Sequence, residues 1–379
     1  MEFDQGWILL GLPMAFALGW LASRFDLRQL KLDNQRTPKA YFKGLNHLLN
    51  EQQDQAIDAF IEAVQNDPDT SELHFALGNL FRRRGEYERA VRVHQHLLAR
   101  ADLSQSDRDR AQHALALDYL KAGLLDRAEA ALQQLEGTAF ASMSHLALLS
   151  IYERSRDWAQ AALMADKLAQ AGEGSFKARQ AHYLCEQAQT LNAPEQWPQA
   201  QSLLERALAM APHNVRASLA LAQGLHRFGQ AAKALDLLLE LAQAQPQALP
   251  LIAPQLAQWA PKMDQVPAVR VLLQKAYDHT PSLDVLKALA ELTTLDAPAS
   301  VPALFLRHLE REPSLVVASQ WMQGQTNTPA GLQKAMDRAV KPLLRYRCAA
   351  CGFEATQHFW QCPGCQAWDS YPARRVEEL

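Results

Sequence analysis

This sequence has no large excess of charge of either sign, because its 379 residues carry a net charge of only −3. Nucleic-acid-binding domains concentrate Lys and Arg on one face, and no long basic stripe with interleaved aromatic residues occurs here. The sequence also lacks a Gly-rich phosphate loop, a His-Glu-x-x-His helix and a nucleophile elbow. We therefore expect no nucleic-acid partner and no catalytic residues.

β-Branched residues are scarce outside the two ends of the chain, whereas Ala, Leu and Gln are abundant. This composition favours helices over strands. With 48% hydrophobic residues the chain can bury a large core, and its length suits an extended array better than one globule. We expect an all-α protein.

The clearest repeating unit lies at residues 71–100. Gly78 and Phe81 share one face of a helix, Gly85 then breaks that helix, and a second amphipathic run starts at Tyr87. Similar units recur at intervals of 33–39 residues, which resembles the tetratricopeptide repeat. Each second helix starts with a small residue, and these are Ala56, Ala90, Ala128, Ala161, Ala200 and Ala234.

The repeat pattern weakens after Pro246, where prolines are frequent. Two more units fit residues 257–281 and 289–313, each ending in proline. Because proline interrupts helix interiors, the helices of the first must be short or differently placed. The region is either a less regular continuation or a diverged packing surface, and the sequence does not choose between them. We assign residues 37–330 to the array and 331–344 to a connecting helix.

Stacked helix pairs form a superhelix whose concave surface usually binds peptides or proteins. Individual array residues are nevertheless expected to have packing roles. We interpret Cys185 as a core residue and the arginine run at residues 82–84 as a solvated helix end. His94 and His96 point in different directions on a helix, which argues against a metal site there. The aromatic residues expected to pack between helices are Tyr87, Tyr119, Tyr152, Trp158 and Trp197.

An uncharged run from Gln5 to Ser23 lies near the N-terminus. As a helix it would cover roughly 28 Å, close to the thickness of a bilayer core. Trp7 and Trp20 lie near its ends, where indoles prefer the membrane interface. The alternatives are a cleaved signal peptide and a buried core helix, but a signal peptide should begin with positive charge, and here acidic residues precede the run. We predict a retained transmembrane anchor at residues 1–24.

A basic linker at residues 25–36 follows the predicted anchor. By the positive-inside rule, this asymmetry of charge places the bulk of the chain in the cytoplasm. The linker either contacts anionic headgroups or is a solvated spacer, and both interpretations stay open.

Four of the five cysteines lie in the last 32 residues, as two Cys-x-x-Cys pairs separated by ten residues. These four are Cys348, Cys351, Cys362 and Cys365. Each pair can form a tight knuckle whose backbone N–H groups point at the thiolates, with Gly352 and Gly364 supplying the permissive backbone angles. Two facing knuckles give a tetrahedral four-sulfur site for one zinc or one iron ion. Disulfides are the alternative, but they are rare in the cytoplasm.

The segment at residues 345–371 resembles a shortened rubredoxin. Its expected aromatic core is Tyr346, Phe353, Phe359, Trp360, Trp368 and Tyr371. Gln366 replaces the glycine that usually follows the last cysteine, and the spacer is far shorter than in electron-carrying rubredoxins. Both differences favour a structural or docking role. We assign residues 345–379 to this domain, which should need its metal to fold, whereas the array should fold without it.

The order of anchor, repeat array and metal domain resembles the lipopolysaccharide assembly protein B family of Gram-negative bacteria. Locally the resemblance rests on Leu77-Gly-Asn-Leu-Phe-Arg-Arg-Arg-Gly-Glu, on Ala181-His-Tyr-Leu-Cys-Glu and on residues 346–368. It implies a non-enzymatic adaptor at the cell inner membrane. The implied partners are the FtsH protease, the deacetylase LpxC whose amount the adaptor and protease control, and other lipopolysaccharide-synthesis proteins. A general membrane-tethered scaffold or co-chaperone and a rubredoxin-type redox carrier are the alternatives.

Overall fold

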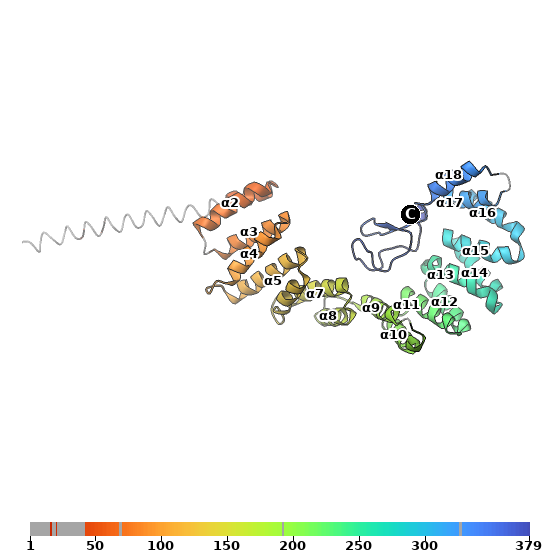
Figure 1. The fold of residues 1–379 in the computed structure, drawn as a ribbon, viewed down its shortest axis with the longest axis horizontal. Helices are drawn as coiled ribbons and strands as arrows, with labels where there is room; N and C mark the ends of the chain where they lie inside the picture. Colours follow the sequence, from red (N-terminus) through yellow and green to blue (C-terminus); the bar gives the residue numbers. More distant parts are fainter. Residues whose placement is uncertain (1–15, 17–19, 21–41, 68–69, 192, 326–327) are drawn as a thin grey trace, which may run out of the picture. The chain divides into compact units, whose positions relative to one another are not determined.

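The computed structural model describes residues 16, 20, 42–67, 70–191, 193–325 and 328–379. The chain forms two compact units, Met1–Glu173 and Gly174–Leu379, and helices stack along each of them (Figure 1). The predicted anchor and basic linker, residues 1–36, lie outside the described residues apart from Phe16 and Trp20. Within the described ranges, no helix is long and apolar enough to cross a membrane.

Consecutive helices pack against each other in both units. After helical residues 42–49, the helices of the N-terminal unit are α2 Gln53–Asn66, α3 Ser71–Arg84, α4 Tyr87–Leu98, α5 Gln105–Lys121, α6 Leu125–Gln133, α7 Ala141–Ser155 and α8 Trp158–Gln170. Those of the C-terminal unit are α9 Lys177–Thr190, α10 Trp197–Met210, α11 Val215–Arg227, α12 Ala231–Ala244, α13 Leu249–Trp259, α14 Val266–His279, α15 Leu283–Asp296, α16 Val301–Arg311, α17 Leu315–Gln323 and α18 Ala330–Val340.

Short 3₁₀ turns and one two-stranded sheet complete the C-terminal unit. The 3₁₀ turns are η1 Pro194–Gln196, η2 Pro246–Ala248, η3 Ala260–Met263, η4 Pro298–Ser300 and η5 Val376–Glu378. The strands β1 Tyr346–Arg347 and β2 Glu354–Ala355 pair antiparallel.

The alanines that mark the repeat period are buried where paired helices meet. All six of them, from Ala56 to Ala234, are at most 4% exposed. Gly85 ends α3 with a φ of 81°, a left-handed conformation that glycine adopts without strain. The prediction of an all-α array of tetratricopeptide-type helix pairs is therefore confirmed.

Residues predicted to have packing roles mostly do. Tyr119, Tyr152 and Trp158 are buried, whereas Tyr87 and Trp197 are half-buried. Cys185 is fully buried in α9, and burial raises the pKa of its thiol to about 11. This thiol is therefore a core group rather than a nucleophile.

Gly78 allows α3 and α4 to approach closely. A Cβ atom there would lie 2.5 Å from both Cε1 and Nε2 of the buried His94. Gly78→Leu should therefore destabilise the N-terminal unit by about 1–3 kcal/mol or more, measured by urea unfolding. Gly331 of α18 is the matched control, because a Cβ there would meet nothing within 4 Å. Gly331→Leu should leave stability unchanged, and equal losses in both variants would contradict close packing at Gly78.

The interpretation of the arginine run as a solvated helix end is wrong for Arg82. Its guanidinium donates hydrogen bonds to the Asp118 carboxylate at 2.9 Å and to the Ala114 carbonyl at 3.1 Å, both on α5. Asp118 is fully buried and also pairs with the ring of His94 on α4. Since the partners satisfy one another's charge, this network joins three helices instead of offering a surface patch.

The helix array continues past Pro246 as far as α18, which favours the less regular continuation over a separate packing surface. Pro250 and Pro267 occupy the first turns of α13 and α14, where a missing N–H removes no helical hydrogen bond. Pro254 lies inside α13, which is only 11 residues long. The first unit of this region therefore begins at Leu249, earlier than the sequence pattern indicates.

Candidate metal centre

Two knuckles of the same backbone pattern carry the predicted cysteines. In the first, Cys348 N–H donates to the Phe353 carbonyl at 2.9 Å, and Gly352 N–H donates to the Cys348 carbonyl at 2.9 Å. In the second, Cys362 N–H donates to the Ala367 carbonyl at 2.9 Å, and Gln366 N–H donates to the Cys362 carbonyl at 2.8 Å. The β1–β2 hairpin leads into the first knuckle, and a bridge between Gln361 and Trp368 closes the second.

The structure brings the four cysteine side chains together, with every Sγ within 4.8 Å of the others. Cys348 Sγ lies 3.8 Å from Cys365 Sγ, and Cys351 Sγ lies 3.7 Å from Cys362 Sγ. A tetrahedral ion with metal–sulfur bonds of about 2.3 Å separates its sulfurs by about 3.8 Å. These distances also exclude disulfides, whose sulfurs lie about 2.05 Å apart. The donor set and its spacing therefore fit one metal ion.

The electrostatics of the four thiols favour a cation at their centre. Burial opposes ionisation of Cys348, but the hydrogen bond between its sulfur and the Ser370 hydroxyl, together with those from the backbone N–H groups of Cys351 and Ala350, lowers its pKa to about 6. The Phe353 N–H favours the thiolate of Cys351, but lost hydration and the neighbouring thiols raise its pKa to about 12. Without a cation the thiols cannot all ionise together, whereas a bound metal deprotonates its ligands.

The prediction that Gly352 and Gly364 both supply permissive angles is half correct. Gly352 has a φ of 77°, in the left-handed region. Gly364 is not in that region, and the equivalent position in the second knuckle is Gln366, with a φ of 63°. Since each knuckle places its left-handed residue directly after its second cysteine, Gln366 holds an angle that favours glycine.

Gln366→Gly should therefore stabilise the metal domain by about 1 kcal/mol, because it relieves the left-handed strain. The reverse change in the first knuckle, Gly352→Ala, should destabilise the domain by a similar amount. Both effects can be measured by titrating each variant with a chelator and comparing the concentrations at which half of the metal is released. A Gln366→Gly variant that loses its metal more readily than wild type would show that the glutamine side chain stabilises the knuckle.

The aromatic core differs from the predicted set. Tyr346 and Tyr371 are buried, and Phe359 packs against them. Phe353 is 44% exposed. Trp360 and Trp368 lie near the array helix α9, with ring centroids 6.3 Å and 4.8 Å from that of His182. The two indoles are therefore docking residues as well as core residues.

The metal domain packs against the helices of its own unit. His182 Nε2 lies 2.9 Å from Asp369 Oδ2, and the His182 ring stacks on Trp368. Tyr183 meets the same indole edge-on at 6.0 Å between centroids. Leu251 of α13 packs against the cluster that contains the buried cysteines. The metal domain is therefore in contact with helices of its own unit, whereas the expectation of an independently folding array treats it as a distant end.

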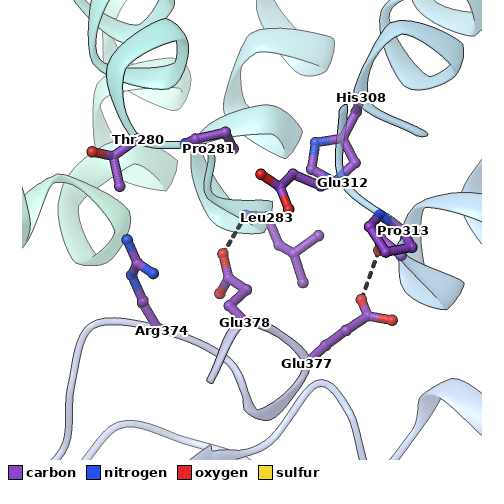
Figure 2. A pocket seen from close by; sticks show the side chains of 10 residues that line it. Thr280, Pro281, Leu283, His308, Glu312, Pro313, Arg374, Glu377 and Glu378 are labelled. Carbon is purple, nitrogen blue, oxygen red and sulfur yellow. Dashed lines mark hydrogen bonds between the residues drawn. The ribbon is translucent and has the colours of Figure 1, made fainter. Parts of the chain in front are cut away.

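The segment after the second knuckle caps two helices. Glu378 accepts a hydrogen bond from the N–H of Leu283, which begins α15, at 2.8 Å. Glu377 accepts hydrogen bonds from the Leu315 N–H at 2.6 Å and the Ser314 hydroxyl at 2.6 Å, at the start of α17. Both glutamates line a cavity of about 160 Å³. Figure 2 shows both carboxylates pointing toward these helix starts. Carboxylates there satisfy free N–H groups and complement the helix dipole.

Sequence reasoning missed these capping glutamates. A signal was present, because the two capped helices start with the same Pro-Ser-Leu triplet, at residues 281–283 and 313–315. Repetition of the triplet marks two equivalent helix starts, but it does not reveal that Glu377 and Glu378 bind them.

Arg375 joins the metal domain to α15. Its guanidinium donates to the two carboxylate oxygens of Asp284, both at 2.8 Å, and to the Leu344 carbonyl at 2.8 Å. The same group lies 4.0 Å from the centroid of the Tyr346 ring. This arrangement combines a bidentate ion pair with a cation–π contact at the edge of the metal domain.

The comparisons with known proteins agree with this architecture. Residues 346–371 match the family described as rubredoxin metal binding domain, and residues 73–109 and 191–258 match tetratricopeptide repeat families. Lipopolysaccharide assembly protein B of Escherichia coli (strain K12) is 31% identical over 98% of this chain and 99% of its own. The Haemophilus influenzae protein of the same name is 30% identical over 96% of each chain.

Among solved structures, a tetratricopeptide repeat protein from Parabacteroides merdae covers 68% of this chain and 99% of its own. Its TM-score is 0.36 and its identity 13%, so the fold assignment rests on the helix pairs and the repeat families instead.

Fold and site together define a helical-repeat protein with a rubredoxin-like, four-cysteine metal-binding domain. Its similarity to the curated relatives extends over nearly the full length of both chains. The chain belongs to the lipopolysaccharide assembly protein B family.

Proposed function

We propose that this protein is a non-enzymatic adaptor in lipopolysaccharide assembly at the cell inner membrane. The observation that carries the proposal is the match over 98% of the chain to a protein named for lipopolysaccharide assembly. A helical-repeat array supports it, because such arrays present extended surfaces to protein partners.

In this proposal one zinc or iron ion, held by Cys348, Cys351, Cys362 and Cys365, stabilises the fold and takes no part in electron transfer. The contacts of the metal domain with α9, α13, α15 and α17 support this role, since they make the ion part of the array's own packing. The bound ion would supply a fixed tetrahedral centre for the two knuckles.

We further propose the domain order predicted from the sequence. Residues 1–24 would form a transmembrane anchor and 25–36 a basic linker, ahead of the array at 37–330, the connecting helix at 331–344 and the metal domain at 345–379. The charge asymmetry around the uncharged run supports a cytoplasmic array. A reporter active only in the periplasm, fused after Leu379, should be inactive, and periplasmic activity would overturn this topology.

The proposed partners are the FtsH protease, its substrate LpxC and other lipopolysaccharide-synthesis proteins. The adaptor would bring LpxC to the protease and so limit its amount. Depletion of the protein in its native cell should lengthen the half-life of LpxC, and photo-crosslinkers in the array should capture FtsH and LpxC. An unchanged half-life together with crosslinks only to unrelated proteins would favour a general scaffold instead.

A further inference from the structure

A small cavity lies between α9, α10 and α11 in the C-terminal unit, apart from the metal site. Its volume is about 230 Å³. This is below the roughly 300–1,000 Å³ of pockets that enclose a whole drug-sized ligand, so it suits one or two side chains of a larger partner. Most of its lining residues lie within residues 191–258, which match a tetratricopeptide repeat family, and the others come from α9.

Small residues leave the cavity open, and aromatic rings form one wall. Ala188 and Ala220 contribute side chains from α9 and α11. Gly224 contributes no side chain, and a Cβ there would lie 2.0 Å from the Trp197 ring. Trp197 stacks on Phe228 with centroids 5.1 Å apart. The wall formed by Trp197 and Phe228 is therefore apolar, and Gly224 leaves no room for the Trp197 ring to move toward α11.

The charge around the cavity is positive. Its lining contains Arg227 and no acidic residue. Arg227 is exposed and makes no ion pair within the part of the chain that the structure describes. Gln189, a lining residue, accepts a hydrogen bond from the buried Arg216, which also pairs with the Glu186 carboxylate at 2.7 Å. Because Glu186 balances the charge of Arg216, the charge left at the cavity is that of the exposed Arg227, and it favours an anionic partner.

We propose that this cavity receives a bulky apolar side chain of an extended peptide segment, with an acidic residue beside it that pairs with Arg227. Gln189 and Gln223 are exposed at the cavity and can exchange hydrogen bonds with the backbone of such a peptide. The proposal rests on the adaptor function and states the chemistry of a segment that the adaptor recognises.

The test uses the full-length protein in detergent and a fluorescein-labelled peptide, Gly-Ser-Asp-Leu-Phe-Glu-Ser-Gly, read by fluorescence anisotropy. Arg227→Glu should weaken binding at least about tenfold, because it places like charges together. Ala220→Leu should weaken it similarly by filling the cavity. The matched control is Arg206→Glu, an exposed arginine of α10 that does not line the cavity, and it should bind as wild type does.

A charge-swapped peptide, with lysine in place of both acidic residues, should bind the Arg227→Glu variant better than it binds wild type. Binding that neither Arg227→Glu nor Ala220→Leu reduces would overturn the site. The protein could instead fail to bind the peptide but bind phosphatidylglycerol vesicles, or associate with itself, in a way that Ala220→Leu abolishes. Either result would overturn the peptide as occupant of the cavity. None of these measurements involves FtsH or LpxC. A failure of the proposed function, seen as an unchanged LpxC half-life, can therefore be distinguished from a failure of this binding site.

Discussion

Replacing Cys348 with serine should release the metal, unfold residues 346–371 and weaken the helices against which they pack. Structural metal sites contribute about 10–16 kcal/mol in peptide systems, and a segment this short has too little core to fold without that energy. Unfolding would free the helix starts at Leu283 and Leu315 from their glutamate caps. Each lost cap costs about 1 kcal/mol, in addition to the lost packing on α9 and α13.

Metal content by mass spectrometry and hydrogen exchange along the chain measure the two parts of this result. Exchange should rise in α9 and at the starts of α15 and α17, and stay unchanged in the N-terminal unit. Cys185→Ala is the control, because this cysteine is buried in α9 outside the four-sulfur cluster and its loss should leave the metal bound. Unchanged protection of α15 and α17 in a metal-free Cys348→Ser protein would show that the array does not depend on the metal domain.

The array and the cysteine cluster could be predicted from the sequence because each depends on short-range spacing. Helix pairs bury their apolar faces on their neighbours, so the repeat period, as seen in the spacing of Ala90 and Ala128, can be read from the sequence alone. Likewise, a knuckle is a local turn, and the spacing of Cys348 and Cys351 defines it. The convergence of the two knuckles follows from the tetrahedral requirement of one metal ion.

Contacts between distant segments could not be predicted in the same way. His182 and Asp369 are 187 residues apart, and neither lies in a pattern that points to the other. Arg82 looked solvated because its partner, Asp118, lies one repeat further along the chain. The left-handed angle at Gln366 had one sequence signal, because rubredoxins usually carry glycine at this position, but the glutamine itself does not show that the backbone keeps the angle.

The ion pair between Arg375 of the metal domain and Asp284 of α15 should contribute strongly to the stability of the C-terminal unit. Arg375→Ala should destabilise the C-terminal unit by about 3 kcal/mol, because Asp284 would lose both of its hydrogen bonds from the guanidinium while remaining mostly buried. For a unit of this size, that loss corresponds to a melting temperature lower by roughly 6–12 °C. The cation–π contact with Tyr346 would be lost as well.

The neighbouring arginine provides the matched control for this variant. Arg374 has no hydrogen bond or ion pair with any residue that the structure describes, and Figure 2 shows its side chain beside the cavity. Arg374→Ala should therefore change stability by no more than about 0.5 kcal/mol, as surface substitutions usually do. The two variants change the net charge equally, so general electrostatics cannot account for a difference in melting. If both melt alike, the Asp284 pair contributes little, and the remaining contacts, which include the packing of Trp368 and Leu251 and the caps from Glu377 and Glu378, hold the metal domain on the array.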